Sequence, residues 1–362
     1  MKSIHLAIAA VAVAAIVIAA GALAASASPD RGGSGPVTLV DGRGETVTVS
    51  SSDRVATIGS VVTEIAFGLG ASSKLAGVTT DDGIYDSDEL ILGMPDDGFP
   101  GDAKKMLADG RLVALGGMYN ISAESILKCS PDLVLMGGYF YSDATIKRLG
   151  DMGIPVVVGK DDNSLDNIYF NIAMYGKALG RDGAAGEMVA GMKSAIGRIV
   201  GWTESLGAPS PRVGTFMGIG SEWGTYACGV KYLPGSPMIE MLGGTNAFAA
   251  GIPEMYAVVS KESIASAAPE VMIDVTPMTQ ADLDALKGDP VLRDVPAVKN
   301  GRVYACFDPC SNAATITSQG FVNAAALMAM FMYEDRLSFE LDHSLGEGYA
   351  EYLREFWAQI GA

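Results

Sequence analysis

The segment "ISAESILKCSPDLVL" (residues 121–135) returns later in the chain as "VSKESIASAAPEVMI" (residues 259–273). In both copies a Ser and a Glu are followed by Ser-Ile, and then by Pro, an acidic residue and an apolar run. This pattern is typical of a short helix that leads into a buried strand. The same order of elements is common in α/β proteins generally, but the shared Ser-x-Glu-Ser-Ile favours a duplicated lobe.

Short apolar strands alternate with helices on both sides of each copy. The strand "RVATIGS" (54–60) precedes the first copy and "IPVVVGK" (154–160) follows it, while "RVGTFMGIG" (212–220) and "GRVYACFD" (301–308) flank the second. Such alternation predicts an α/β fold with parallel sheets covered on both faces. The stretch "VTLVDGRGETVTVS" (37–50) adds a predicted β-hairpin, with its turn at Asp41-Gly42.

The N-terminal stretch "MKSIHLAIAAVAVAAIVIAAGALAASAS" has one Lys, an apolar run and then small residues of the A-x-A kind. It predicts an export signal over residues 1–27, with a retained membrane anchor as the alternative. Residues 28–36 predict a flexible tether. We expect an N-terminal lobe at 37–165, a helical linker at 166–210 without a convincing strand, and a C-terminal lobe at 211–362.

Composition narrows the choice of partners. The 362 residues suit two domains. A formal net charge of -17 argues against a nucleic acid, which requires a basic face. Four Cys and two His leave little material for a metal site or a His-based catalytic centre. We therefore expect no metal site and no His-based catalysis.

Six segments together resemble the substrate-binding proteins of ABC importers for vitamin B12, iron-siderophores and haem. They follow in the family's order: "RVATIGSVVTEIAFGLGASSKLAGVTT" (54–80), "NISAESILKCSPDLVLMGG" (120–138), "LGDMGIPVVVGKDDNSLDNI" (149–168), "MIEMLGGTNAFA" (238–249), "VSKESIASAAPEVMID" (259–274) and "DPVLRDVPAVKNGRVYAC" (289–306). Each segment alone is a weak signal, and their common order gives the resemblance its weight.

The resemblance implies two Rossmann-like lobes joined by one long rigid helix near residues 184–206, with a ligand cleft between them. It also implies an exported, monomeric binding protein without a cofactor, which captures a metal chelate and delivers it to an ABC permease with a cytoplasmic ATPase. Iron-siderophore and corrinoid (vitamin B12-like) chelates are the leading ligand classes, and haem is third.

The resemblance also gives the repeated segment a role. Members of the family present one surface Glu on each lobe to arginines of the permease, and the matching residues here are Glu124 and Glu262. A carboxylate on each lobe can pair with Arg and fix orientation. The alternative is two solvated acids that favour the helix dipole.

Ligand contacts in this family come from loops that follow strands. Aromatic rings there suit a large flat ligand. The expected ligand-binding residues are Met118, Tyr119, Asn120, Tyr139 and Tyr141 in the first lobe, and Trp223, Tyr226 and Tyr256 in the second.

Cys306 and Cys310 follow the strand "GRVYACFD" and leave three readings open: a disulfide, two free thiols or a ligand contact. Two other functions also stay open. One is a membrane-anchored surface sensor or adhesion module; the other is a cysteine-dependent metal or redox protein on the same scaffold.

Overall fold

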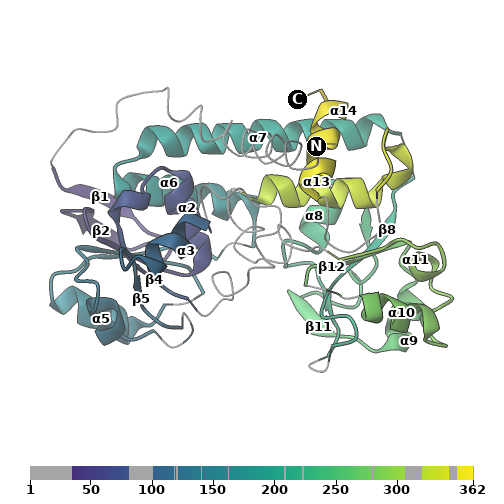
Figure 1. Ribbon diagram of the computed structural model, residues 1–362, viewed down its shortest axis with the longest axis horizontal. Coiled ribbons are helices and arrows are strands. Elements are labelled where there is room, and N and C mark those ends of the chain that lie inside the picture. The colour runs from purple at the N-terminus through teal and green to yellow at the C-terminus, as the bar shows by residue number, and fades with distance from the viewer. Residues whose placement is uncertain are drawn as a thin grey trace. The chain divides into compact units, whose positions relative to one another are not determined.

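The computed structural model describes residues 35–80, 101–305, 320–341 and 349–361, apart from residues 118, 120, 140, 162, 208, 222, 223, 277 and 279. The described chain divides into two compact units (Figure 1). Unit 1 holds the described residues up to Lys193, and unit 2 holds those from Ser194 onward. Both units are α/β, as the alternating pattern predicts.

Unit 1 is built on a five-stranded sheet in the order β5-β4-β3-β6-β7, in which every pairing is parallel. The residues of β3, β4, β6 and β7 are all buried, as expected for parallel strands covered on both faces. The elements of the sheet and its helices are β3 (Val55–Ile58), α2 (Ser60–Gly68), β4 (Leu75–Val78), α3 (Gly101–Ala108), β5 (Val113–Ala114), α4 (Ala123–Leu127), β6 (Leu133–Met136), α5 (Asp143–Asp151), β7 (Val156–Val158) and α6 (Leu165–Leu179).

One face of this sheet forms a core with α4 and α5. Ile126 of α4 and Leu149 of α5 are fully buried against strand residues such as Ile58, Val134 and Val158. On the other side, α2 and α6 pack against each other. The predicted hairpin is confirmed as β1 (Val37–Val40) paired antiparallel with β2 (Thr46–Val49), and β1 packs on α6.

Unit 2 departs from the expectation of a purely parallel sheet. Its path runs β11-β9-β8-β12-β13 with β10 also beside β8. The pairings of β8 with β10 and β12, and of β12 with β13, are parallel, but β9 is antiparallel to both β8 and β11. The sheet is mixed because a short loop, rather than a crossover helix, connects β8 to β9. Its strands are β8 (Arg212–Met217), β9 (Tyr226–Cys228), β10 (Thr245–Asn246), β11 (Tyr256–Val258), β12 (Val271–Asp274) and β13 (Val303–Ala305).

Helices cover both faces of the second sheet. On one face, Phe216 and Met272 pack with Ile264, Leu283 and Val298, which belong to three helices that lie together in Figure 1. On the other face, α13 lies against β12, and Tyr304 of β13 stacks on Phe331 of α13 at 4.5 Å. The helices of unit 2 are α8 (Ser236–Met241), α9 (Lys261–Ala267), α10 (Gln280–Gly288), α11 (Pro296–Lys299), α13 (Phe321–Met332) and α14 (Tyr349–Gln359).

The long helix α7 (Asp182–Ser205) runs continuously through the division between the units at Lys193 and Ser194. A buried stripe at spacings of three and four residues follows its length: Ala185, Met188, Met192, Ile196, Ile199 and Thr203. Its first half lies on unit 1, where the Lys193 ammonium sits 4.9 Å from the ring centre of Tyr169 in α6. In its second half, Trp202 meets the rings of Tyr333 and Phe356 edge to face, at 6.0 and 5.0 Å.

Candidate functional site

The two copies of the repeated segment fold in the same way from their first residue. Ser122 caps α4 by accepting a hydrogen bond from the Ser125 N–H at 3.1 Å. Ser260 caps α9 in the same way, with the Ser263 N–H at 3.2 Å. Glu124 and Glu262 each occupy the second position of their helix, where a carboxylate favours the positive end of the helix dipole. The repeat therefore presents one exposed acid per unit in the same local frame.

Behind each helix an arginine ties the helix end to the sheet. Arg54 donates to the carbonyls of Cys129 and Ser130, at 2.7 and 3.1 Å, and its backbone N–H donates to Asp132. Arg212 donates to the carbonyl of Ala267 at 2.6 Å, and its backbone N–H donates to Glu270 at 2.8 Å. Arg54 immediately precedes the central strand β3 and Arg212 is the first residue of the central strand β8, so equivalent contacts hold the duplicated segment on both sheets.

The backbone repeats as well. Ser130 and Ala268 precede the proline of each copy, and both have positive φ, 48° and 45°. Within the described residues no other residue apart from glycine adopts positive φ. A side chain with a Cβ is strained in this conformation. Both strained residues lie between the short helix and the proline that stands two residues before the next strand.

The two acids differ in their surroundings. Glu124 forms an ion pair with Arg148 of α5, and both side chains are more than half exposed. Beside Glu262, Lys261 is held by Asp289 at 2.6 Å, and the described residues offer Glu262 no ion pair. A hydrogen bond from its own backbone N–H lowers the pKa of each Glu; Arg148 adds to this at Glu124, and Ser260 adds to it at Glu262. Both carboxyls are therefore ionised at neutral pH.

Two of the tyrosines expected to contact ligand lie just past β6 in unit 1. Tyr139 and Tyr141 are both nearly half exposed, and Ser142 behind them caps α5. The turn that carries them packs closely against the backbone of residues 160 and 161. A Cβ on Gly138 would stand 2.5 Å from the Lys160 carbonyl carbon and 2.6 Å from the Asp161 nitrogen. Tyr119 lies on another loop of unit 1 and is 73% exposed. The chain thus places three aromatic side chains on the surface of this unit.

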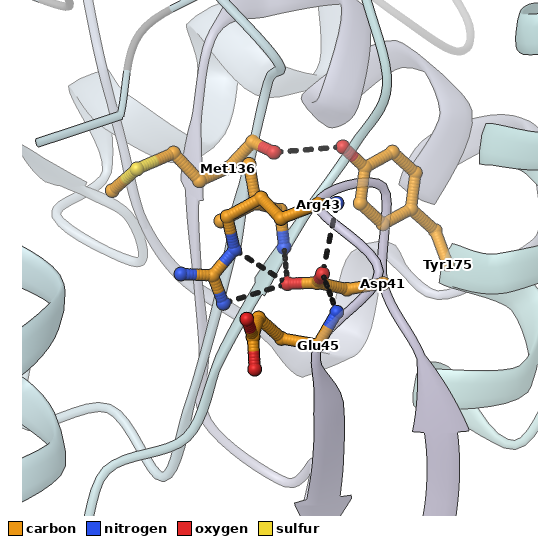
Figure 2. Close-up of polar contacts among 6 residues, drawn as sticks. Asp41, Arg43, Glu45, Met136 and Tyr175 are labelled. Atoms are coloured by element: carbon orange, nitrogen blue, oxygen red, sulfur yellow. Dashed lines mark hydrogen bonds and ion pairs between the residues drawn. The ribbon is translucent and has the colours of Figure 1, made fainter. Parts of the chain in front are cut away.

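The strand ends beneath these loops are fixed by polar contacts (Figure 2). The Tyr175 hydroxyl of α6 donates to the carbonyl of Met136, the last residue of β6, at 2.8 Å. Asp41 in the hairpin turn accepts from the guanidinium of Arg43 and from the backbone N–H of Val158, the last residue of β7. The hairpin and α6 therefore brace the carboxyl ends of β6 and β7, where ligands bind in open α/β sheets.

Unit 2 brings two of the expected ligand residues into contact. The ring of Tyr226 in β9 meets the ring of Tyr256 in β11 edge to face, with centres 5.8 Å apart. Tyr232 also meets Tyr256 edge to face, with ring centres 5.8 Å apart. Tyr256 stays 47% exposed. Sequence reasoning missed Tyr232, because its place beside Tyr256 depends on the antiparallel pairing of β9 with β11.

Several expected residues fall outside the described part of the chain. These are Met118, Asn120, Trp223, Cys306 and Cys310, together with the export signal at 1–27 and most of the tether. The other two cysteines, Cys129 and Cys228, are buried free thiols. Among the described residues, no three His, Cys, Asp or Glu side chains are grouped to hold a metal ion, and no helix is both long and apolar enough to cross a membrane.

Comparison with known proteins identifies the family of this chain. The family model described as periplasmic binding protein matches residues 55–309. The chain therefore belongs to the periplasmic binding protein family. This is a family of solute-binding proteins, so the chain is a binding protein and not an enzyme.

Two relatives share part of the sequence. An uncharacterised ABC transporter substrate-binding lipoprotein of Bacillus subtilis, YvrC, is 30% identical over 162 residues, which is 44% of this chain and 45% of that protein. The cobalamin-binding protein of Halobacterium salinarum is 28% identical over 285 residues, which is 77% of this chain and 70% of that protein. This chain thus spans less than half the length of the first relative.

Solved structures share the fold at lower identity. The haem-binding protein RhuT of Roseiflexus sp. RS-1, in its apo form, gives a TM-score of 0.63 at 24% identity, covering 78% of this chain and 99% of that one. A solute-binding protein of Veillonella parvula gives 0.66 at 19% identity, covering 90% and 92%. At this identity the likeness establishes the architecture alone.

Proposed function

We propose that this protein is the extracytoplasmic solute-binding component of an ABC importer. It captures a metal chelate and delivers it to a membrane permease, without chemical change. The family membership supports the binding role, and the name of the Bacillus subtilis relative supports its link to an ABC transporter. The apolar stretch and small residues within 1–27 support export.

Among the chelates, we favour a corrinoid. The observation that carries this choice is the cluster of Tyr226, Tyr232 and Tyr256, whose rings are locked edge to face and leave Tyr256 half exposed. Rigid aromatic side chains supply contact area to a large flat ligand at little cost in conformational entropy. The alignment over most of the chain with a protein named for cobalamin binding adds support. Iron-siderophores and haem are the competing ligands.

For delivery, we propose that Glu124 and Glu262 dock on basic residues of the permease. Each is exposed, ionised and presented by a capped helix in the same local frame. Matching carboxylates on two similar units can orient the protein on a two-fold permease.

Native mass spectrometry tests the capture role. The purified protein is mixed with cyanocobalamin, ferric ferrichrome, ferric enterobactin and haemin, and the adduct mass names the ligand. We expect a one-to-one cyanocobalamin adduct, which weakens in a Tyr226→Ala/Tyr256→Ala variant. The control is Tyr352→Ala, which removes a ring of a separate stacked pair with Phe339 in unit 2. An iron complex or haem as the adduct would replace the corrinoid choice, and no adduct at all would reject capture of these chelates.

A further inference from the structure

Asp274 is a fully buried acid at the end of β12. Its carboxylate accepts four hydrogen bonds: from the Ile219 N–H at 2.6 Å, the Gly218 N–H at 3.2 Å, and the N–H and hydroxyl of Thr276 at 2.8 and 2.6 Å. The donors therefore come from two places, the turn after β12 and the loop after β8. Asp274 and Thr276 together fasten that loop to the neighbouring strand, since the Gly218 N–H also donates to the Thr276 hydroxyl at 2.8 Å.

The described residues of the loop at 218–225 lie in neither a helix nor a strand. Gly218, Gly220 and Gly224 all have positive φ, between 69° and 102°, so the backbone follows a path that only glycine adopts without strain. Inside the loop, the Ser221 N–H donates to the Gly218 carbonyl and the Gly224 N–H to the Ser221 carbonyl. At its far end, the Thr225 carbonyl accepts from the Val259 N–H at 2.9 Å. Asp274 anchors the near end.

This loop leads directly into the tyrosine cluster. Trp223 lies in it by sequence, and Tyr226 follows it as the first residue of β9. The ring of Tyr226 then contacts Tyr256, and through it Tyr232. Tyr226 is held by the pairing of β9 with β8 and β11, and the loop joins this strand to the residues that Asp274 anchors.

A buried carboxylate at the end of β12 destabilises the fold unless hydrogen bonds compensate the free energy lost when the charged group leaves water. In unit 1 the residue at the same place in the repeated segment is Met136, so the sheet itself does not require an acid there. There β3 is followed at once by α2, whose helical hydrogen bonds hold the backbone in place. Unit 2 has a loop instead of a helix at this point, and Asp274 accepts from the first two N–H groups of that loop.

We propose that Asp274 is a positioning residue of the ligand site: it holds the loop at residues 218–225, and with it Tyr226, in the arrangement that receives the ligand. This inference rests on the proposed function, in that the tyrosine cluster must contact ligand. Asp274 itself is buried and acts through the loop.

The test compares Asp274→Asn with Glu270→Gln. Glu270 lies just before the same strand, β12, and its carboxylate accepts from the Arg212 N–H, so its loss perturbs the strand without touching the loop. Thr276→Val is a milder loop variant, which keeps the side-chain shape and removes the hydroxyl contacts. Hydrogen exchange of the peptide containing residues 218–225, thermal unfolding and the dissociation constant for cyanocobalamin are measured for each full-length protein.

In Asp274→Asn we expect exchange in the loop and the dissociation constant to rise by about ten-fold, the scale of one or two lost charged hydrogen bonds. Thr276→Val should give a smaller change in the same direction. Glu270→Gln should lower thermal stability and leave both other measurements unchanged. Equal weakening of binding in Glu270→Gln and Asp274→Asn would reduce Asp274 to a general stabilising residue, and so would loosening of the loop with unchanged affinity. Should Asp274→Asn fail to fold, Thr276→Val decides between these results.

The test separates this inference from the proposed function. If the unaltered protein binds none of the chelates, the proposed function fails, and the exchange measurement still shows whether Asp274 anchors the loop. If the unaltered protein binds cyanocobalamin and Asp274→Asn binds it equally well, the function stands and the positioning role is overturned.

Discussion

Arg54 and Arg212 hold equivalent places in the two units. Each lies at the start of the central strand of its sheet, Arg54 just before β3 and Arg212 as the first residue of β8. Each donates from its guanidinium to a carbonyl at the end of the helix that starts with Ser-x-Glu-Ser, and donates its backbone N–H to the acid after the proline. The backbone N–H of that acid in turn donates to the arginine carbonyl: Asp132 to Arg54 at 2.8 Å in unit 1, and Glu270 to Arg212 at 2.7 Å in unit 2. The repeated segment is thus one part of a larger duplicated frame, and that frame fixes the direction of both helices that carry the candidate docking acids.

The arginine contacts should contribute measurably to stability. We expect Arg54→Ala to lower the free energy of unfolding by about 1–3 kcal/mol, the range for hydrogen bonds that involve a charged group. Arg111→Ala is the control, because Arg111 forms an exposed ion pair with Asp109 and its loss should change stability by less than about 0.5 kcal/mol. Denaturation in urea measures both. Equal effects of the two substitutions would mean that the bonds to the helix end contribute nothing.

At the strained turn before the second proline, we expect a substitution that stabilises the protein. Ala268 has φ of 45°, so Ala268→Gly should relieve strain and stabilise the protein by up to about 1 kcal/mol. Ala267→Gly, one residue earlier and inside α9, should instead destabilise it by about 0.5–1 kcal/mol. Thermal unfolding of the two single variants gives the comparison. A loss of stability in both would show that the turn carries no strain at Ala268.

The alternation of strands and helices and the duplicated segment were readable from the sequence, because local periodicity and helix capping act over a few residues. The mixed sheet of unit 2 was not, since "YAC" and "YAV" are too short to reveal their antiparallel pairing. The Asp274 anchor was hidden for a different reason. In "EVMIDV" the acid looks like the polar end of an apolar strand, and the two loop donors that it holds lie 55 and 56 residues earlier in the chain. Such long-range polar contacts leave no local pattern.

The cysteines should separate into two classes by reactivity. Burial raises the pKa of the Cys228 thiol to about 12 and also raises that of Cys129, so both thiols stay largely protonated at pH 8. We expect both to resist iodoacetamide in the folded protein and to react after denaturation. Mass spectrometry of the digested peptides checks this. The same experiment resolves Cys306 and Cys310: free thiols are labelled in the native protein, whereas a disulfide is labelled only after reduction. Rapid native labelling of Cys228 would contradict its burial.

The turn that carries Tyr139 and Tyr141 should not tolerate a side chain at Gly138. A Cβ there would overlap the backbone of Lys160 and Asp161, so Gly138→Ala must displace the turn. We expect weaker binding of the chelate together with a loss of about 1–3 kcal/mol of stability, as for other overpacked sites. Gly150→Ala is the control: it lies in α5 with open space around its Cβ and should be neutral or slightly stabilising. Titration calorimetry and urea denaturation report the two effects, and unchanged affinity in Gly138→Ala would remove this turn from the ligand site.

The candidate docking acids should act on delivery and not on capture. We expect Glu262→Lys and Glu124→Lys each to reduce uptake in proteoliposomes that contain the permease, while the dissociation constant of the chelate stays unchanged. The loss should be greater for Glu262→Lys, because Glu124 is already paired with Arg148. Glu351→Lys is the control for an equal change of net charge, since this exposed acid lies on α14 and its ion pair is with Arg354. Loss of chelate binding in either docking variant would place that acid at the ligand instead.

The pH dependence of docking follows from the same two carboxyls. The pKa of each lies below the ordinary value of 4.5, chiefly through the hydrogen bond from its own backbone N–H. The ionised form is the one that pairs with basic residues, so affinity for the permease should be constant from neutral pH down to the ordinary value. It should fall only as the pH drops below 4.5, where protonation removes the charge. High salt should weaken docking at any pH because these acids are exposed. Binding to the permease that is insensitive to salt, or that declines already between pH 7 and pH 6, would show that other groups carry the contact.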